Sequence, residues 1–462
     1  RRVSEPGVYY RESRMGYALL GSIVERYSRM NFDAAIKRYV FAPIGMTESV
    51  FAVASDDMKK LATGYDQRGR TVQYEYRYDL PASGMSTTAG DMGRFMLAQL
   101  SGGAIGRGRI LGETHAGSMM RRQFSPSPMI NGTAMGYLET PVAGLRTLQQ
   151  YGDMPGYSGF LMLIPEKHFG LFIAANASGI DFGDELSRSV AERFFPASGD
   201  MREQPAAGTV TVYRGIEGYY RTNMISRHTA ERILRIASDQ INISIESGCV
   251  TASHTRDAIP PTRWLPYGPG GDLFRRVGDD GNYAGEYMFF QRGAAGEVTA
   301  LVMGGVNRTY DKLKPYECYY AQWAIIAGFA ATALLSFIGL FIGNAINKGR
   351  FPWENGLSSD TELWGISSLF WAVQSAFAGG LIVAAELVGN EFKVFVPYQV
   401  KALFVIPLAG GLLLAWLWFR LLAKLLNSEH HWLEKITITA GALVGTGYMF
   451  FLAQWRLLGF MF

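Results

Sequence analysis

Serine residues are the first candidates for chemistry in this sequence, because a serine becomes a nucleophile when a base lies within hydrogen-bond reach. No serine among the 462 residues is followed three positions later by lysine, so the chain contains no Ser-x-x-Lys pairing of nucleophile and base. Ser158 lies in Gly156-Tyr157-Ser158-Gly159-Phe160, which lacks the Gly-x-Ser-x-Gly pattern of a nucleophile elbow. We interpret Ser158 as part of a turn that enters a strand.

Histidine and cysteine give no metal-binding or triad pattern, and we expect no metal and no cofactor. Cys249 and Cys318 are the two cysteines, too few for a disulfide framework, although one bridge between them stays open. Net charge is +4, without a basic stripe interleaved with aromatic residues, which argues against nucleic acid as a partner. Histidines stand in unrelated contexts, and the last pair is interpreted as part of an interfacial loop: His115, His168, His228, His254 and His430-His431.

Helices and strands alternate irregularly over the first two hundred residues, as expected for an α/β domain. One helix is predicted from Met15 to Ser28, with Leu19, Leu20, Ile23, Val24 and Tyr27 as its apolar face. Further predicted elements are a helix after Asn31 that stops at 43–46, a helix that starts at Thr88 and ends at Leu100, and a hairpin of strands 160–164 and 171–175.

A second part follows a turn-rich segment at 198–207, which we interpret as a linker between a domain at 1–197 and a small β domain at 208–318. Apolar and polar residues alternate with a period of two at 209–213, 241–245 and 298–302. This pattern favours a small antiparallel sheet or barrel, which we interpret as a spacer or lid.

The region from 321 to 462 carries long apolar runs. A helix that spans a membrane needs roughly 20 mainly apolar residues, and such runs can supply them. We predict about four transmembrane helices in a bundle, with small residues such as Gly339 and Gly445 at close helix contacts. Glu386, near one end of a run, is interpreted as interfacial. The predicted spans are 323–343, 363–389, 402–419 and 436–453.

Orientation is predicted from lysine and arginine, which favour cytoplasmic loops. The first and third predicted loops carry more of them than the second loop and the tail. We therefore expect a multi-pass protein of a membrane, the bacterial inner membrane being favoured, with the first 320 residues on the periplasmic or extracellular side. The start at Arg1 shows no signal peptide, which suggests that the sequence begins inside a longer protein.

Four segments of the first region, in this order and spacing, resemble the serine β-lactamase and penicillin-binding-protein family, in its class C-like branch. The later small β domain and apolar helices resemble a membrane-anchored branch of that family. The resemblance covers about residues 1–197, an incomplete β-lactamase/transpeptidase-like domain that lacks the upstream Ser-x-x-Lys motif. Its segments are Pro6-Gly7 with Gly16-Tyr17-Ala18-Leu19-Leu20-Gly21, Phe41-Ala42-Pro43-Ile44-Gly45-Met46, Pro81 to Met92, and Gly152 to Asn176.

The resemblance also indicates pocket positions, and the polar residues at those positions depart from the family. Glu12 and Arg14 stand where the family has Tyr-x-Asn, and a slip of two residues would offer Tyr10 instead. Gln150 and Gly152 stand where His-x-Gly or Lys-Thr-Gly is usual. Either Glu12 serves as a base and Arg14 replaces the missing positive charge, or the pocket is degenerate and the two side chains form an ion pair.

Two functions follow from the resemblance, and a third needs no pocket. The first is a membrane-anchored serine hydrolase acting on a cell-wall peptide, β-lactam or ester. The second is a membrane-tethered binding protein that keeps the pocket without the chemistry. The third is a structural membrane protein. In each of them the lipid bilayer is a partner.

Overall fold

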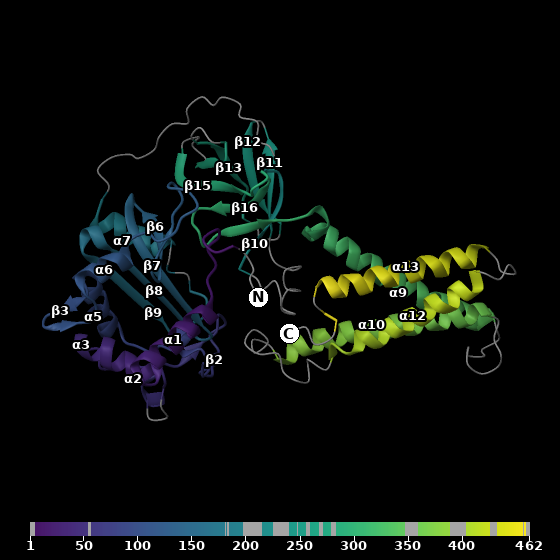
Figure 1. The fold of residues 1–462 in the computed structure, drawn as a ribbon, viewed down its shortest axis with the longest axis horizontal. Coiled ribbons are helices and arrows are strands. Elements are labelled where there is room, and N and C mark those ends of the chain that lie inside the picture. Colours follow the sequence, from purple (N-terminus) through teal and green to yellow (C-terminus); the bar gives the residue numbers. More distant parts are fainter. Residues whose placement is uncertain are drawn as a thin grey trace.

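The structure is a computed structural model of the chain, in which a mixed α/β region, a β-barrel and a group of long helices follow one another (Figure 1). The predicted linker at 198–207, the predicted strand at 209–213 and the pair His430-His431 lie outside the described residues. The structure describes residues 5–53, 57–180, 182, 184–196, 215–224, 240–246, 248–255, 259–267, 271–278, 283–346, 359–388, 403–425, 432–455 and 457–458.

The first region has the predicted α/β composition, and its helices begin where the sequence provides caps. Ser13 accepts a hydrogen bond from the Gly16 N–H and starts α1 (Arg14–Ser28), while Thr88 accepts one from Asp91 and starts α5 (Ala89–Leu100). The other helices are α2 (Phe32–Ile36), a π-helical turn (Lys37–Phe41), α3 (Ala42–Ile44), α4 (Leu80–Ser83), α6 (Glu113–Met120) and α7 (Asp184–Phe194).

A five-stranded antiparallel sheet forms the centre of this region, in the order β5-β6-β7-β8-β9. One group of buried residues joins Leu148, Leu161 and Leu163 to the helices α3 and α5, and another joins Phe160 and Met162 to the region near α7. The predicted hairpin is therefore confirmed. The strands are β5 (Thr133–Ala134), β6 (Tyr137–Val142), β7 (Leu145–Met154), β8 (Tyr157–Ile164) and β9 (Phe169–Ala175), beside the small hairpins β1–β2 (Gly64–Tyr65, Thr71–Val72) and β3–β4 (Ala104–Ile105, Gly108–Arg109).

Helix α1 differs from the expectation in one respect, because much of its predicted apolar face is open. Leu19 is 64% and Leu20 57% exposed, and Tyr27 is 84% exposed. The helix is instead held by its opposite side, where Gly21 is buried against Pro81 of α4 so closely that a Cβ on Gly21 would lie 2.1 Å from the Pro81 ring. These apolar residues lie on one face of α1, as predicted, but no described element covers that face.

The second region is a closed eight-stranded antiparallel barrel, which confirms the predicted small β architecture. Its interior is filled by side chains that include Trp264, Phe274 and Phe290. Cys249 and Cys318 are both free thiols, so the open question of a bridge is answered in the negative. The strands are β10 (Gly218–Thr222), β11 (Gln240–Glu246), β12 (Cys249–His254), β13 (Thr262–Pro266), β14 (Leu273–Val277), β15 (Tyr283–Arg292), β16 (Val298–Met303) and β17 (Thr309–Lys312).

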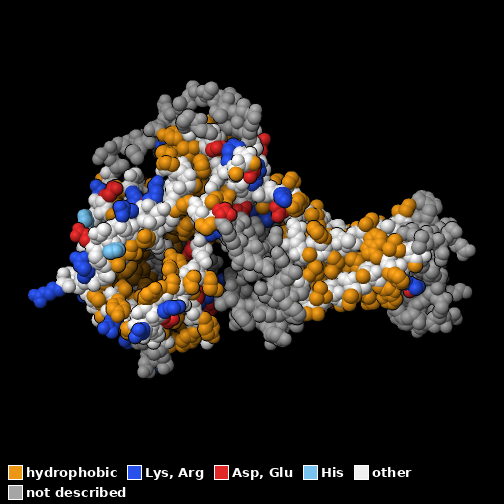
Figure 2. All heavy atoms as spheres, in the orientation of Figure 1, with side chains coloured by type: hydrophobic (Ala, Val, Ile, Leu, Met, Phe, Trp, Pro, Cys, Tyr) orange, Lys and Arg blue, Asp and Glu red, His pale blue; other side chains and the backbone are white. Residues whose placement is uncertain are grey.

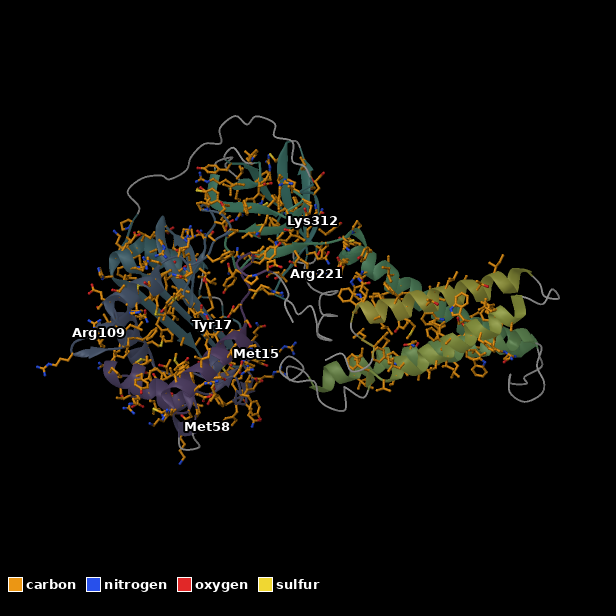
Figure 3. All side chains as sticks on the ribbon, viewed as in Figure 1. Met15, Tyr17, Met58, Arg109, Arg221 and Lys312 are labelled. Atoms are coloured by element: carbon orange, nitrogen blue, oxygen red, sulfur yellow. The ribbon has the colours of Figure 1, made fainter. Side chains whose placement is uncertain are left out.

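The barrel is fastened to the helix that follows it. The backbone N–H of Tyr319 donates to Gln240 of β11 at 2.9 Å, and the buried Arg221 of β10 donates to the carbonyl of Glu317. Figure 3 shows Arg221 and Lys312 at the end of the barrel from which this helix leaves. Burial, and repulsion from Arg292, lower the pKa of Lys312 below its ordinary value.

Four long helices lie within the described residues of the third region, at the positions of the four predicted spans: α9 (Tyr319–Ile346), α10 (Ser359–Val388), α12 (Ile406–Leu425) and α13 (Trp432–Gln454). Two described helical segments, Tyr319–Gly339 and Ile406–Ala423, are long and apolar enough to cross a membrane, and Ile438–Gln454 is a shorter apolar one. Gly339 lies close to Trp364, and Gly445 close to Leu414, as expected for small residues at helix contacts.

Candidate functional site

The carboxyl-terminal half of β7 lies at an edge of the sheet that the described strands form. β6 pairs with β7 only as far as Gln149, which lies opposite Leu138. Beyond that point the described pairs of β7 are all with β8, from Gln150 opposite Leu161 to Met154 opposite Tyr157. A strand at the edge of a sheet can accept an added strand through its backbone N–H and C=O groups.

Space is open beside this edge. A Cβ placed on Gly152 would meet nothing within 4 Å, and Gly152 is exposed. Figure 2 shows the molecule hollowed over the strands of the sheet, with hydrophobic side chains along the margin of the hollow. Two of the four predicted pocket residues, Gln150 and Gly152, thus lie on an accessible strand edge.

The other two predicted residues, Glu12 and Arg14, lie at the start of α1, where both are exposed. Glu12 stands close enough to two phenols to act on them electrostatically. Burial, then the negative charge of Glu12, raises the pKa of Tyr10 to about 12, and the same two causes raise the pKa of Tyr17. Figure 3 shows Met15 and Tyr17 on α1.

No side-chain hydrogen bond or ion pair joins the Glu12–Arg14 segment to Gln150 in the described part of the chain. The ion pair between Glu12 and Arg14 that the sequence suggested is likewise not formed among these residues. Ser13, which lies between them, is used as the N-cap of α1 through a 3.1 Å hydrogen bond from Gly16. The described hydrogen bonds and ion pairs thus do not join the two pocket segments, and Glu12, Arg14 and Gly152 are exposed.

Ser158 has the structural role expected from its sequence. It lies at the start of β8, after Gly156 in the left-handed conformation (φ 88°), and is 5% exposed. Its Oγ donates to the carbonyl of Ala177 at 2.8 Å and accepts from the N–H of Ile180 at 3.1 Å. These hydrogen bonds tie β8 to the loop after β9, and Ser158 Oγ also lies 3.5 Å from Oδ1 of Asp153.

One residue of this sheet edge, Tyr151, was missed by the sequence interpretation. Tyr151 lies between Gln150 and Gly152, is 42% exposed, and donates from its hydroxyl to Gln149 at 2.8 Å. Its ring packs against Phe160 with centroids 5.1 Å apart. The available signal was an aromatic residue among polar ones and glycine, in Gln149-Gln150-Tyr151-Gly152-Asp153.

Among the described residues, no group of three or more histidine, cysteine or acidic side chains is placed so that it could hold a metal ion.

Comparison with known proteins gives the first region a family relation. Residues 1–193 match the family model described as Beta-lactamase. Putative beta-lactamase-like 1 of Homo sapiens is 24% identical over 224 residues, which are 47% of this chain and 44% of that protein. Protein flp of Staphylococcus aureus is 24% identical over 179 residues, 37% of this chain and 34% of its own length. The chain thus spans less than half the length of these curated relatives.

Solved structures include similar chains at low identity. The octameric penicillin-binding protein homologue from Pyrococcus abyssi has 19% identity and a TM-score of 0.36, covering 67% of this chain and 66% of its own. SurE has 18% identity and a TM-score of 0.43, with 68% and 70% covered. A class C beta-lactamase has 18% identity and a TM-score of 0.34, with 41% and 57% covered.

Proposed function

Because the chain belongs, over residues 1–193, to the serine β-lactamase and penicillin-binding-protein-like family, we propose that it is a membrane-tethered protein that binds an extended acyl-amide or ester ligand beside β7. Cell-wall peptides, β-lactams and related esters are the ligand class. The observation that carries the proposal is the sheet edge that β7 forms from Gln150 to Met154, where its described strand pairs are all with β8.

A strand at the edge of a sheet binds an extended ligand through its main chain, while neighbouring side chains select which ligand fits. Gly152 leaves room for close approach of the ligand backbone, and Tyr151 offers an exposed aromatic surface. Gln150 adds hydrogen-bonding groups without charge. We therefore expect recognition of the amide or ester rather than strong attraction of a carboxylate.

Binding, rather than turnover, is the function that these 462 residues support. They contain no Ser-x-x-Lys pair, and Ser13, beside Glu12 in sequence, and Ser158, opposite Asp153 of β7, are engaged in structural hydrogen bonds. Hydrolysis is the family's chemistry, and no described side chain of this chain takes the nucleophile's place.

We expect Gly152→Val to weaken ligand binding at least about tenfold, because its side chain fills the open space that a ligand backbone needs. The measurement is fluorescence anisotropy of a labelled D-alanyl-D-alanine peptide with the full chain in detergent. Valine suits a strand and meets no neighbour at this position, so the fold should persist.

Gly117→Ala is the matched control, because a Cβ there also meets open space but on α6. Equal affinity in the wild type and in Gly152→Val, or no saturable binding by the wild type, would contradict a ligand site at this edge.

Membrane attachment is proposed from the exposure of the third region's apolar side chains. A helix of a soluble core is mostly buried, yet only 11% of the apolar window in α9 and 28% of that in α12 is buried. Leu335 of α9 is 63% exposed, and Leu412 and Phe419 of α12 are 75% and 69% exposed. Water disfavours such a surface, whereas lipid chains match it. We propose four spans, with the first two regions outside the cytoplasm.

Membranes that contain this protein should retain it through an alkaline carbonate wash and release it only in detergent. Because Cys249 is a partly exposed free thiol of the barrel, a membrane-impermeant maleimide should label it in intact cells. The buried Cys318 is an internal control that should stay unlabelled until the protein is denatured. Release by carbonate would contradict the anchor, and labelling of Cys249 only after lysis would contradict the orientation.

A further inference from the structure

The segment that leads into Glu12 is held by the barrel rather than by its own region. Gln291 of β15 donates to the carbonyl of Val8 at 3.0 Å, and the hydroxyls of Tyr9 and Thr299 lie 2.8 Å apart. Asn223, just after β10, donates from Nδ2 to the carbonyl of Tyr10 at 3.2 Å. The hydrogen bonds described for the carbonyls of Val8 and Tyr10 thus both come from the barrel.

Asn223 makes this connection in both directions. The backbone carbonyl of Asn223 accepts from the guanidinium of Arg11, and its side-chain Nδ2 donates to the carbonyl of Tyr10, the residue before Arg11. Asn223 is 2% exposed, and its backbone N–H donates to Thr309 at 3.0 Å, which fixes it to the wall of the barrel. A buried side chain anchored in this way can hold a neighbouring segment in one position.

A second contact keeps the barrel against the first region. Asn131 donates from Nδ2 to the carbonyl of Gly304 at 2.9 Å, and its own carbonyl accepts from Val306 at 3.1 Å. Tyr10 packs into the apolar cluster that Ile130 forms with Val302 and Val306. The barrel and the first region are therefore joined here by an apolar cluster and by the two hydrogen bonds of Asn131.

We propose that the barrel is part of the ligand site, because it positions the segment Val8–Arg11 and through it Glu12, with Asn223 as the main positioning residue. Glu12 follows Arg11 directly, and Ser13 then starts α1, so the position of this segment sets both Glu12 and the first turn of α1. In this proposal the barrel, which the sequence analysis interprets as a spacer or lid, holds a fixed position against the first region. The part of the proposal that concerns ligand affinity rests on the proposed function, whereas the part that concerns position does not.

Asn223→Asp tests the position directly. The variant keeps the shape of the side chain but replaces the N–H donor with an oxygen, which repels the Tyr10 carbonyl. Trypsin needs Arg11 free and its backbone extended, so cleavage after Arg11 reports release of the segment. We expect this cleavage to be about tenfold faster in the variant, the effect of losing one buried hydrogen bond. Mass spectrometry of the new terminus at Glu12 gives the rate.

Gln291→Leu is the second variant, since it removes the donor to Val8 without burying a charge, and it keeps the test decisive if Asn223→Asp fails to fold. Asn242→Ala, on β11, is the matched control. Cleavage after the exposed Arg70 should be equal in all proteins. Unchanged cleavage after Arg11 in both variants would overturn the proposal.

Affinity for the labelled D-alanyl-D-alanine peptide separates the two claims. A loss of affinity that accompanies faster cleavage supports a site shared by the barrel and the first region. Faster cleavage with unchanged affinity would overturn the barrel's part in the site while leaving its hold on the segment intact. If the wild type binds no peptide, the proposed function fails, and the cleavage rates alone decide whether Asn223 positions the segment.

Discussion

No covalent acyl-enzyme is expected when this chain is incubated with a labelled penicillin. Acylation requires a serine hydroxyl with a base beside it, and losing a catalytic nucleophile typically removes orders of magnitude in rate. Intact-mass spectrometry is the measurement, and the expected mass is that of the unmodified chain.

The two serines that could mislead this experiment are accounted for by the structure. Ser13 lies beside Glu12 in sequence, but its Oγ accepts the capping hydrogen bond of α1. Ser158 is 5% exposed, with its hydroxyl bound between Ala177 and Ile180. The carboxylate of Asp153 lies 3.5 Å from Ser158 Oγ, at the limit of a hydrogen bond, whereas the hydroxyl donates to the Ala177 carbonyl at 2.8 Å.

A stoichiometric mass gain mapped to one serine within residues 1–193 would contradict this expectation and return hydrolysis to first place. Displacement of the labelled peptide by the same penicillin, without any mass gain, is the pattern expected of a binding site. The two readings together separate non-covalent recognition at the β7 edge from acylation.

Local signals predicted the elements near the candidate site well. The helix from 15 to 28, the cap at Thr88 and the hairpin that became β8 and β9 all depend on contacts within a few residues, and each is present. The resemblance assigned Gln150 to a pocket, and the strand that carries it is a sheet edge only beyond Gln149. Register between β6 and β7 decides this, and register is a long-range property.

Tertiary features of the site could not be predicted for the same reason. The apolar face of α1 gave a correct helix, but its exposure depends on what lies opposite Leu19 and Tyr27. The hold of Asn223 on Tyr10 joins residues 213 positions apart, and no local pattern marks an asparagine for that role. Apolar runs predicted the long helices because composition alone determines them.

Glu139→Gln is expected to destabilise the first region by about 3 kcal/mol, because it removes one partner of a buried ion group. Glu139 on β6 is 4% exposed, and Arg146 donates to its Oε1 at 2.7 Å. Its Oε2 accepts from Arg122 and from the N–H of Gly132. The group ties β6 and β7 to the loop before β5, so its loss should loosen the sheet that carries Gln150.

The effect of pH on this variant has a definite sign. Burial alone would raise the pKa of the Glu139 carboxyl, but the hydrogen bonds and charges of Arg146 and Arg122 lower it below its ordinary value. A group whose folded pKa is lowered stabilises the fold above its unfolded pKa, about 4.3, and that contribution is lost as pH falls through the folded value. Wild type and variant should therefore differ most at neutral pH and converge in acid.

Thermal unfolding of the full chain in detergent, followed by loss of protease resistance of the first region, measures this difference. A change of about 3 kcal/mol corresponds to a fall in Tm of roughly 6–12 °C for a domain of this size. Glu166→Gln, an exposed acid in the turn before β9, is the matched control, and a surface change of this kind should stay within about 0.5 kcal/mol. A Tm difference for Glu139→Gln that persists unchanged at about pH 3, below the ordinary range of a glutamate pKa, would show that the charge of Glu139 is not what holds β6 to the two arginines.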